Sequence, residues 1–213
     1  MNRPLVVASL PIKSINDLEK LDEITDADFI ELRLDYLKSL KEVDLNTLEK
    51  YKSKLIITIR DINEGGINKI EDVEKLSFLK YANQKGFLYD VELEFVKKYD
   101  IPYKSKIISV HYFRDLPNFN LLKNEIEKYS KDVLFFKIAV IAKPGYKSLL
   151  ANLLEISDNV VVIPMSENPL ERIAFGILGS RLLYGFVTEP TAKGQLMYRE
   201  IVKIINELFK YKF

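Results

Sequence analysis

The chain has 213 residues, 47% of them hydrophobic, and its 32 basic residues nearly balance its 31 acidic residues. This length and apolar content predict one domain over residues 1–213, and the scattered charge and short apolar runs predict neither a nucleic-acid partner nor membrane contact. The sequence has no cysteine and a single histidine, which excludes disulfides, sulfur-ligated zinc and paired-histidine metal sites, so we expect a cytoplasmic protein with a small-molecule partner.

Short apolar runs rich in β-branched residues predict eight strands along the chain. They cover residues 5–10, 29–34, 54–60, 87–93, 106–111, 133–140, 159–165 and 185–188. Segments with helical periodicity lie between several of them, as at residues 15–24, 70–79 and 146–156. Ser14, Asn118 and Asn168 are predicted to mark helix starts.

The alternation of strand and helix, at about 25 residues per unit, predicts an α/β fold. Strands that are apolar almost throughout are typical of a parallel sheet covered by helices, and eight such units favour a single (β/α)8 TIM barrel. An open, doubly wound sheet is the alternative. It is disfavoured because the first strand leads into Pro11 and not into a glycine-rich nucleotide-binding turn.

Polar residues, and one methionine, stand at the ends of these apolar runs. Because a barrel carries its chemistry at the carboxyl ends of its strands, they define a candidate site. The residues are Ser9, Glu31, Arg33, Arg60, Asp90, Glu92, His111, Lys137, Met165 and Ser166, with Thr191 and Gln195 after the eighth strand.

Lys137 lies inside the apolar sixth strand, where burial favours a neutral amine, which is a nucleophile toward ketones. The alternative is a lysine that reaches water or pairs with a carboxylate. His111 ends the preceding strand, so we expect it beside Lys137, where an imidazole can move a proton at the carbon next to an iminium. The two residues together favour catalysis over a structural lysine and a core histidine.

Arg33 and Arg60 end consecutive strands, and guanidinium groups in a barrel mouth suit a carboxylate or a phosphate. Glu31 shares a face with Arg33, so ion pairs that only position other groups are an equal alternative. The loop at residues 64–66 carries two glycines, which indicate either close approach to a ligand or a plain turn. Met165 by itself is more typical of a core than of a ligand contact.

The ordered motifs of the chain resemble those of the type I 3-dehydroquinate dehydratases from the first strand to the last helix. They are Glu31-Leu32-Arg33-Leu34-Asp35, Thr58-Ile59-Arg60 followed by Glu64-Gly65-Gly66, Ser109-Val110-His111, Lys137-Ile138-Ala139, Met165, Arg172-Ile173-Ala174 and Gly194-Gln195. Several ordered motifs at matching spacing make the resemblance specific.

This resemblance implies a hydro-lyase of the shikimate pathway that removes water from 3-dehydroquinate by syn elimination. It implies that Lys137 forms a Schiff base with the substrate ketone and that His111 removes the α proton and then protonates the leaving hydroxyl. Glu64 resembles the family glutamate that helps set the protonation of the histidine. The implied substrate contacts are Arg172 and Gln195 on the carboxylate, with Ser9, Glu31, Arg33, Arg60, Met165 and Thr191 around the rest of the pocket.

The resemblance also implies chemistry without a metal or an organic cofactor, and a barrel this compact favours a homodimer. Four departures from the family pattern stand out: Tyr112 after the histidine, Thr191 for a serine, Lys193 for a proline, and one residue fewer between Met165 and Arg172. We expect Thr191 to keep the hydroxyl contact and Lys193 to loosen the loop over the pocket.

Two alternatives remain open at this point. One is another Schiff-base barrel of the aldolase or transaldolase type, which the lack of a glycine-rich phosphate loop after the seventh and eighth strands disfavours. The other is a barrel that binds a carboxylate without turning it over, which the presence of both Lys137 and His111 disfavours.

Overall fold

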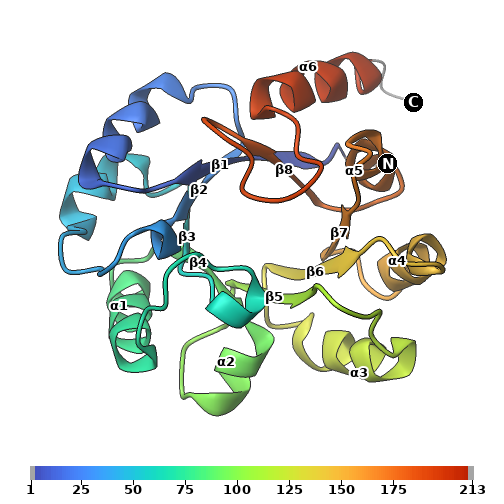
Figure 1. Ribbon diagram of the computed structural model, residues 1–213, viewed down its shortest axis with the longest axis horizontal. Coiled ribbons are helices and arrows are strands. Elements are labelled where there is room, and N and C mark those ends of the chain that lie inside the picture. The colour runs from blue at the N-terminus through green and yellow to red at the C-terminus, as the bar shows by residue number, and fades with distance from the viewer. Residues whose placement is uncertain (1–2, 211–213) are drawn as a thin grey trace.

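The computed structural model describes residues 3–210. Its strands form one parallel sheet in the order β7-β6-β5-β4-β3-β2-β1-β8. The strands are β1 (Leu5–Pro11), β2 (Phe29–Arg33), β3 (Leu55–Thr58), β4 (Leu88–Glu92), β5 (Ile107–Tyr112), β6 (Phe135–Ile141), β7 (Val160–Met165) and β8 (Leu182–Phe186). They curl around the centre of the molecule with the helices outside them (Figure 1), and the predicted single (β/α)8 TIM barrel is confirmed.

The helices follow the strands in chain order, and the longer ones cover the outer face of the sheet (Figure 1). They are η1 (Ile15–Glu23), η2 (Leu34–Tyr36), η3 (Leu45–Tyr51), η4 (Ile62–Glu64), α1 (Asp72–Gln84), α2 (Leu93–Lys98), α3 (Phe119–Tyr129), α4 (Tyr146–Leu154), α5 (Leu170–Ile177) and α6 (Tyr198–Leu208). The elements labelled η are 3₁₀ helices, so the first two crossovers contain no α-helix. Within residues 3–210, no helix is long and apolar enough to cross a bilayer.

The seam between β7 and β8 differs from the other strand pairs. β1 is hydrogen-bonded to both β2 and β8, and ladders continue from β2 to β7, but none joins β7 to β8 in the described part of the chain. There the Ser180 hydroxyl accepts from the Val162 N–H at 3.0 Å and donates to the Val162 carbonyl at 3.1 Å. A buried side chain therefore takes the place of a ladder near the amino ends of these two strands.

Both faces of the sheet are buried, which explains why its strands are apolar almost throughout. Outward residues pack under the helices, whereas inward residues such as Val7, Ile107 and Leu182 fill the barrel interior. Toward the carboxyl ends the inward positions become polar, as in β5, where Ile107 is followed on the same face by Ser109 and His111. This change along each strand places the polar residues together at one end of the barrel.

Asn118 is the N-cap of α3 as predicted, whereas α5 begins at Leu170 with Pro169 as its N-cap, one residue after the predicted Asn168. The Asn118 side chain accepts from the Leu121 N–H at 3.1 Å, and the Asn168 side chain accepts from the Leu170 N–H at 3.1 Å. The first predicted helix, at residues 15–24, is the 3₁₀ helix η1, whose N-cap is Ser14.

Two details of the predicted elements are wrong. The eighth strand covers Leu182–Phe186 and not residues 185–188, because Leu182 pairs with Leu5 of β1 and the chain leaves the sheet after Phe186. In α1 the predicted apolar stripe includes Val73, which is 76% exposed, while Lys75 is buried. Lys75 turns inward because it forms an ion pair with the buried Glu92 of β4.

Candidate active site

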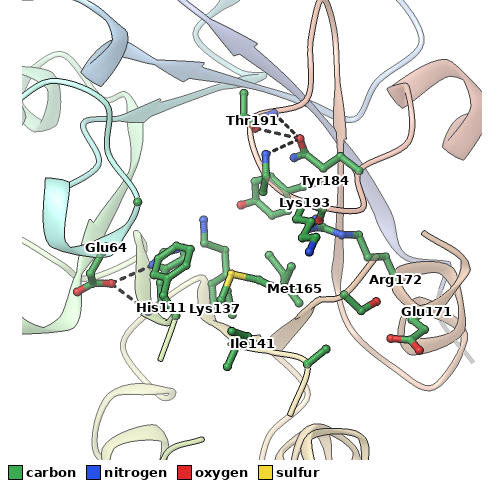
Figure 2. Close-up of a pocket in the computed structure, with 18 of the residues that line it drawn as sticks. Glu64, His111, Lys137, Ile141, Met165, Glu171, Arg172, Tyr184, Thr191 and Lys193 are labelled. Atoms are coloured by element: carbon green, nitrogen blue, oxygen red, sulfur yellow. Dashed lines mark hydrogen bonds and ion pairs between the residues drawn. The ribbon is translucent and has the colours of Figure 1, made fainter. Parts of the chain in front are cut away.

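A cavity of about 650 Å³ opens at the carboxyl ends of the strands. Figure 2 shows the Lys137 amine projecting into it, with Glu64 and His111 on one side and Arg172 and Tyr184 on the other. Ten of the eleven site residues predicted from the sequence line this cavity, namely Glu31, Arg33, Arg60, Glu64, His111, Lys137, Met165, Arg172, Thr191 and Gln195. The other, Ser9, is fully buried behind Glu31 and Thr191.

Lys137 lies on the inner face of β6 and is only 3% exposed. Its amine forms an ion pair with the Asp90 carboxylate, lies 4.0 Å from a Glu31 oxygen, and packs 4.6 Å from the centre of the Tyr184 ring. The sequence thus predicted the burial of Lys137 correctly, and it also offered the carboxylate pairing as its alternative.

His111 ends β5, and Glu64 of η4 holds it. One Glu64 oxygen accepts both the His111 backbone N–H at 3.0 Å and a hydrogen bond with ring Nδ1 at 2.9 Å. The two donors fit an ionised Glu64 and a proton on Nδ1, which leaves Nε2 as the basic nitrogen. Gly65 adopts a left-handed φ of +89°, and a side chain there would collide with Phe113, whose ring stacks beside His111.

The surroundings of Glu64 and His111 shift the pKa values of both groups. Burial, together with the positive charges of Arg60 and Lys137, holds the pKa of His111 well below its usual range. Burial also raises the pKa of Glu64 to about 7, although Arg60 opposes this shift. The imidazole is therefore neutral near pH 7, as a general base must be.

Arg60 is the centre of a buried ion network beneath the cavity. It donates to Asp90 at 2.8 Å, to Ser109 at 2.7 Å and to Glu92 at 3.1 Å. Glu92 in turn forms the ion pair with Lys75. Although burial opposes it, Arg60 and Lys137 hold the pKa of Asp90 well below its usual range. Arg60 thus lines the cavity while its donors are taken by protein groups.

Arg33 is paired in the same way. Its guanidinium donates two hydrogen bonds of 2.8 Å to the fully buried Asp35. Asp35 also accepts from the backbone N–H groups of Arg60 and Ile67, at 3.3 and 3.2 Å. This ion pair therefore anchors the loop that carries Glu64, and the scaffolding alternative accounts for these contacts.

Arg172 differs from the other two arginines. It lies in the first turn of α5 and is only 5% exposed, and no carboxylate pairs with it within residues 3–210. Its only described hydrogen bond donates to the Lys193 carbonyl at 2.7 Å, and its Nε has no partner. Burial without a carboxylate lowers the pKa of Arg172 to about 10. The site thus holds an uncompensated cation that suits an anionic ligand.

Gln195 and Thr191 come from the loop that follows β8. The Gln195 side-chain oxygen accepts from the Thr191 N–H at 2.7 Å, the Thr191 hydroxyl at 3.1 Å and the Ala192 N–H at 3.1 Å. These bonds orient the side chain and leave its NH₂ group as a donor at the cavity. The Thr191 hydroxyl also lies 3.2 Å from that of Ser9, which donates to Glu31 at 2.5 Å.

Two departures in sequence have a structural outcome. Tyr112 follows His111 in a strand and therefore faces away from it, packing against the outer core. His111 is oriented by Glu64, so it needs no partner at position 112. The shorter segment before Arg172 still delivers this residue to the cavity, in the first turn of α5.

Sequence reasoning missed two residues of the site. Asp90 was noted as a strand-end residue, but its ion pair with Lys137 was not predicted. Tyr184 was missed because the predicted eighth strand began at residue 185. In the structure Tyr184 belongs to β8, and its side chain packs with the other inward residues of the barrel. Among the described residues, no group of three or more His, Asp or Glu side chains is arranged to hold a metal ion.

The fold and these side chains define a barrel enzyme with an amine, a carboxylate-bound imidazole and an unpaired arginine at its mouth. The model of the type I 3-dehydroquinase family matches residues 6–212. The chain therefore belongs to the type I 3-dehydroquinase family, and it is a hydro-lyase.

Similar proteins agree with this assignment. The chain is 51% identical over 209 residues to a 3-dehydroquinate dehydratase of Saccharolobus solfataricus, covering 96% of this chain and 94% of that protein. It is 46% identical to that of Sulfolobus acidocaldarius over 206 residues, with the same shares of each chain covered. A crystal structure of the enzyme from Geobacillus kaustophilus superposes with a TM-score of 0.78 at 18% identity, covering 99% of this chain and 93% of the other, which supports the fold.

Proposed function

We propose that this enzyme removes water from 3-dehydroquinate to give 3-dehydroshikimate, a step of the shikimate pathway, through a Schiff base on Lys137. The names of its relatives support the substrate. One observation carries the mechanism: the buried Lys137 amine and the Glu64-bound His111 open onto the same cavity as the unpaired Arg172. A ketone and a carboxylate on one small molecule would satisfy both ends of this cavity.

The first half of the reaction is a condensation. The Lys137 ammonium gives up a proton, its nitrogen attacks the ketone carbon, and the ketone oxygen leaves as water. Overall, the ammonium and the ketone give an iminium and one water molecule, whose two hydrogens come from the ammonium. The ion pair with Asp90 holds the Lys137 nitrogen in position during this exchange. The iminium then acidifies the neighbouring carbon.

The second half is the elimination. Neutral His111 removes the α proton through Nε2, and the electron pair forms an enamine. The resulting imidazolium returns that proton to the leaving hydroxyl as the carbon–oxygen bond breaks, so a second water departs and a conjugated iminium remains. Hydrolysis then releases the product and restores the ammonium. The low pKa of His111 keeps it available as a base in the first of these steps.

The remaining residues bind and orient. Arg172 and the Gln195 amide hold the substrate carboxylate, because they are the donors that the protein leaves without an acidic partner. The other contacts are proposed for Glu31, Arg33, Arg60, Met165 and Thr191, and Ser9, which lies behind the cavity wall, is proposed to act through its hydrogen bonds with Glu31 and Thr191. The paired arginines act mainly by ordering the charge around Lys137.

The match to the type I 3-dehydroquinase family disfavours the two alternatives that the sequence left open, an aldolase-type barrel and a barrel that binds a carboxylate without turning it over. Three lesser proposals concern the whole chain: that residues 1–213 form one domain, that it acts as a homodimer, and that it works in the cytoplasm. A single unfolding transition and the mass in solution by light scattering test the first two. Fractionation of the source cells tests the third.

Borohydride reduction in the presence of 3-dehydroquinate tests the Schiff base directly. We expect one reduced adduct, located on Lys137 by peptide mass spectrometry. We expect Lys137→Ala to lose activity by about 10⁴-fold or more, as removal of a covalent nucleophile does in other enzymes. Lys143→Ala, at an exposed lysine outside the cavity, is the matched control. Turnover without an adduct would refute the mechanism and leave the substrate assignment standing.

A further inference from the structure

Tyr184 is a buried tyrosine in the wall of the cavity that the proposed mechanism does not use. It lies on the inner face of β8, opposite Val7 of β1, and is 4% exposed. Its side chain lines the cavity, yet its hydroxyl is buried without a hydrogen-bond partner among the described residues. Nearly all buried polar groups in proteins have such a partner, so the unpartnered hydroxyl of Tyr184 calls for an explanation.

The cost of this arrangement points to a ligand. Burying a hydroxyl without a partner lowers stability, whereas phenylalanine would fill the same space without that loss. The ring alone would be enough to pack against Lys137 and to complete the barrel interior. The oxygen of Tyr184 therefore makes no hydrogen bond within the described residues, and a molecule in the cavity would supply the missing acceptor.

The position of the ring indicates which part of that molecule it meets. The Lys137 nitrogen lies 4.6 Å from the ring centre, and in Figure 2 the Tyr184 oxygen is directed toward the side of the cavity on which this amine lies. The Asp90 oxygen nearest to this amine is already occupied, because it forms the ion pair with Lys137. The Tyr184 hydroxyl is thus the polar group without a partner that lies nearest to the nitrogen in this part of the cavity wall.

The hydroxyl is suited to donate and keep its proton. Burial, with the negative charges of Glu31 and Asp90, raises the pKa of Tyr184 well above its usual range. A neutral phenol beside an acceptor oxygen donates one hydrogen bond without ionising.

We propose that the Tyr184 hydroxyl donates a hydrogen bond to the ketone oxygen that Lys137 attacks and holds this oxygen until it leaves as water. The proposal rests on the Schiff-base mechanism above. As nitrogen bonds to carbon, the electron pair of the carbonyl moves onto this oxygen, which takes up the proton shed by nitrogen. A second proton arrives as the carbon–oxygen bond breaks. Tyr184 stabilises the charge on the oxygen in both steps and supplies neither proton.

The same hydroxyl is not needed for the carboxylate. Arg172 and Gln195 already offer donors from α5 and from the loop after β8. Tyr184 instead stands where Lys137 and the carbon it attacks must meet. It is thus a catalytic contact for the condensation and not for the elimination.

Tyr184→Phe removes only the oxygen, so the test is a single-turnover measurement of adduct formation. Wild type and variant are mixed with saturating 3-dehydroquinate, quenched with borohydride at successive times, and the adduct on Lys137 is counted by mass spectrometry. We expect adduct formation to slow by about 10- to 100-fold, as for loss of one donor to a developing oxyanion. Tyr129→Phe, at a buried tyrosine that packs on Tyr103 outside the cavity, is the control with unchanged rate.

A second readout separates this role from a structural one. With substrate deuterated at the α carbon, an isotope effect on turnover in the wild type is expected to shrink in Tyr184→Phe, because condensation becomes rate-limiting. The thermal midpoint of the variant should be unchanged or higher. An unchanged adduct rate, or a higher KM with an unchanged rate at saturation, would overturn the proposal for Tyr184 alone. Absence of any adduct in the wild type would overturn the Schiff-base mechanism as well.

Discussion

The buried polar groups on two opposite walls of the cavity differ in whether the protein itself supplies their partners. On the wall from β2 to β6, which we call the paired wall, Arg33, Arg60 and Lys137 all have carboxylate partners. On the wall from β7, α5 and β8, the open wall, Arg172 has no carboxylate and Tyr184 has no hydrogen-bond partner among the described residues. The paired wall is thus complete before a ligand arrives. The open wall keeps buried polar groups without a protein partner, which is what the proposed substrate contacts require.

This difference separates two tasks that one cavity must perform. Charges that tune Lys137 and His111 need fixed positions, which internal ion pairs provide. Groups that bind the substrate must keep their hydrogen-bonding capacity free, at a cost in stability to the empty protein. Substitutions on the two walls should therefore have opposite effects on stability, and this contrast can be tested.

The largest effect is expected on the paired wall. Arg60→Met leaves the carboxylates of Asp90 and Glu92, both buried, with one partner fewer each. We expect the free energy of unfolding to fall by about 3–5 kcal/mol, the usual result of breaking a buried ion pair. Urea denaturation measures it. A loss below about 1 kcal/mol would mean that the network of Lys75 and Lys137 suffices without Arg60.

Arg172→Met is the matched substitution on the open wall. It removes a buried cation whose pKa burial has already lowered to about 10, so we expect stability to stay the same or rise. The KM for 3-dehydroquinate should rise by about 100-fold, because the proposed contact with the substrate carboxylate is lost. Steady-state kinetics and urea denaturation of the same preparation measure both. A destabilisation as large as that of Arg60→Met would remove the distinction between the two walls.

Glu64 tests how the paired wall sets the state of His111. Its pKa is raised to about 7, so we expect kcat/KM to rise with pH through that value as its carboxylate ionises and accepts the His111 Nδ1–H. Glu64→Gln should flatten this rise and lower kcat/KM by about 10-fold near pH 8, with a smaller difference near pH 6. An unchanged pH profile would assign the titration to another group.

The same shift has a consequence for stability with a defined sign. A carboxyl group whose pKa is raised on folding contributes stability that is fully present below its unfolded pKa of about 4.5 and is lost as pH rises through about 7. Glu64→Gln should therefore become more stable than wild type as pH increases over that window. Thermal midpoints at three pH values follow this crossover. A difference in thermal midpoint between Glu64→Gln and wild type that stays constant with pH would contradict a raised pKa for Glu64.

The smallest effect is expected at the rim of the open wall. Lys193 forms a 2.7 Å ion pair with Glu167, but the two side chains are 65% and 83% exposed. Exposed pairs of this kind contribute little, so Lys193→Ala should change KM by less than about threefold. The Lys193 contact with Arg172 uses the backbone carbonyl and survives the substitution. A tenfold change would show that this pair controls access to the cavity.

The alternation of buried strands and helices predicted the barrel because each unit has its own local signature. Lys137 and His111 could be placed together because parallel strands bring their carboxyl ends to one edge. Tyr184 was lost with a three-residue error in β8, where the sequence runs from Leu182 into the following loop without a turn signal. A local pattern sets the type of an element more firmly than its ends.

The sequence by itself determined the barrel, the candidate nucleophile and base, and most of the cavity lining, because side-chain alternation and the succession of strands and helices can be read from local patterns. Tertiary structure alone decided which arginine is paired. Arg60 meets Asp90 across 30 residues of chain and Arg33 meets Asp35 two residues away, whereas Arg172 meets no carboxylate within residues 3–210. An ion pair depends on the distance between two side chains in the folded protein, and this distance cannot be read from their separation in the sequence.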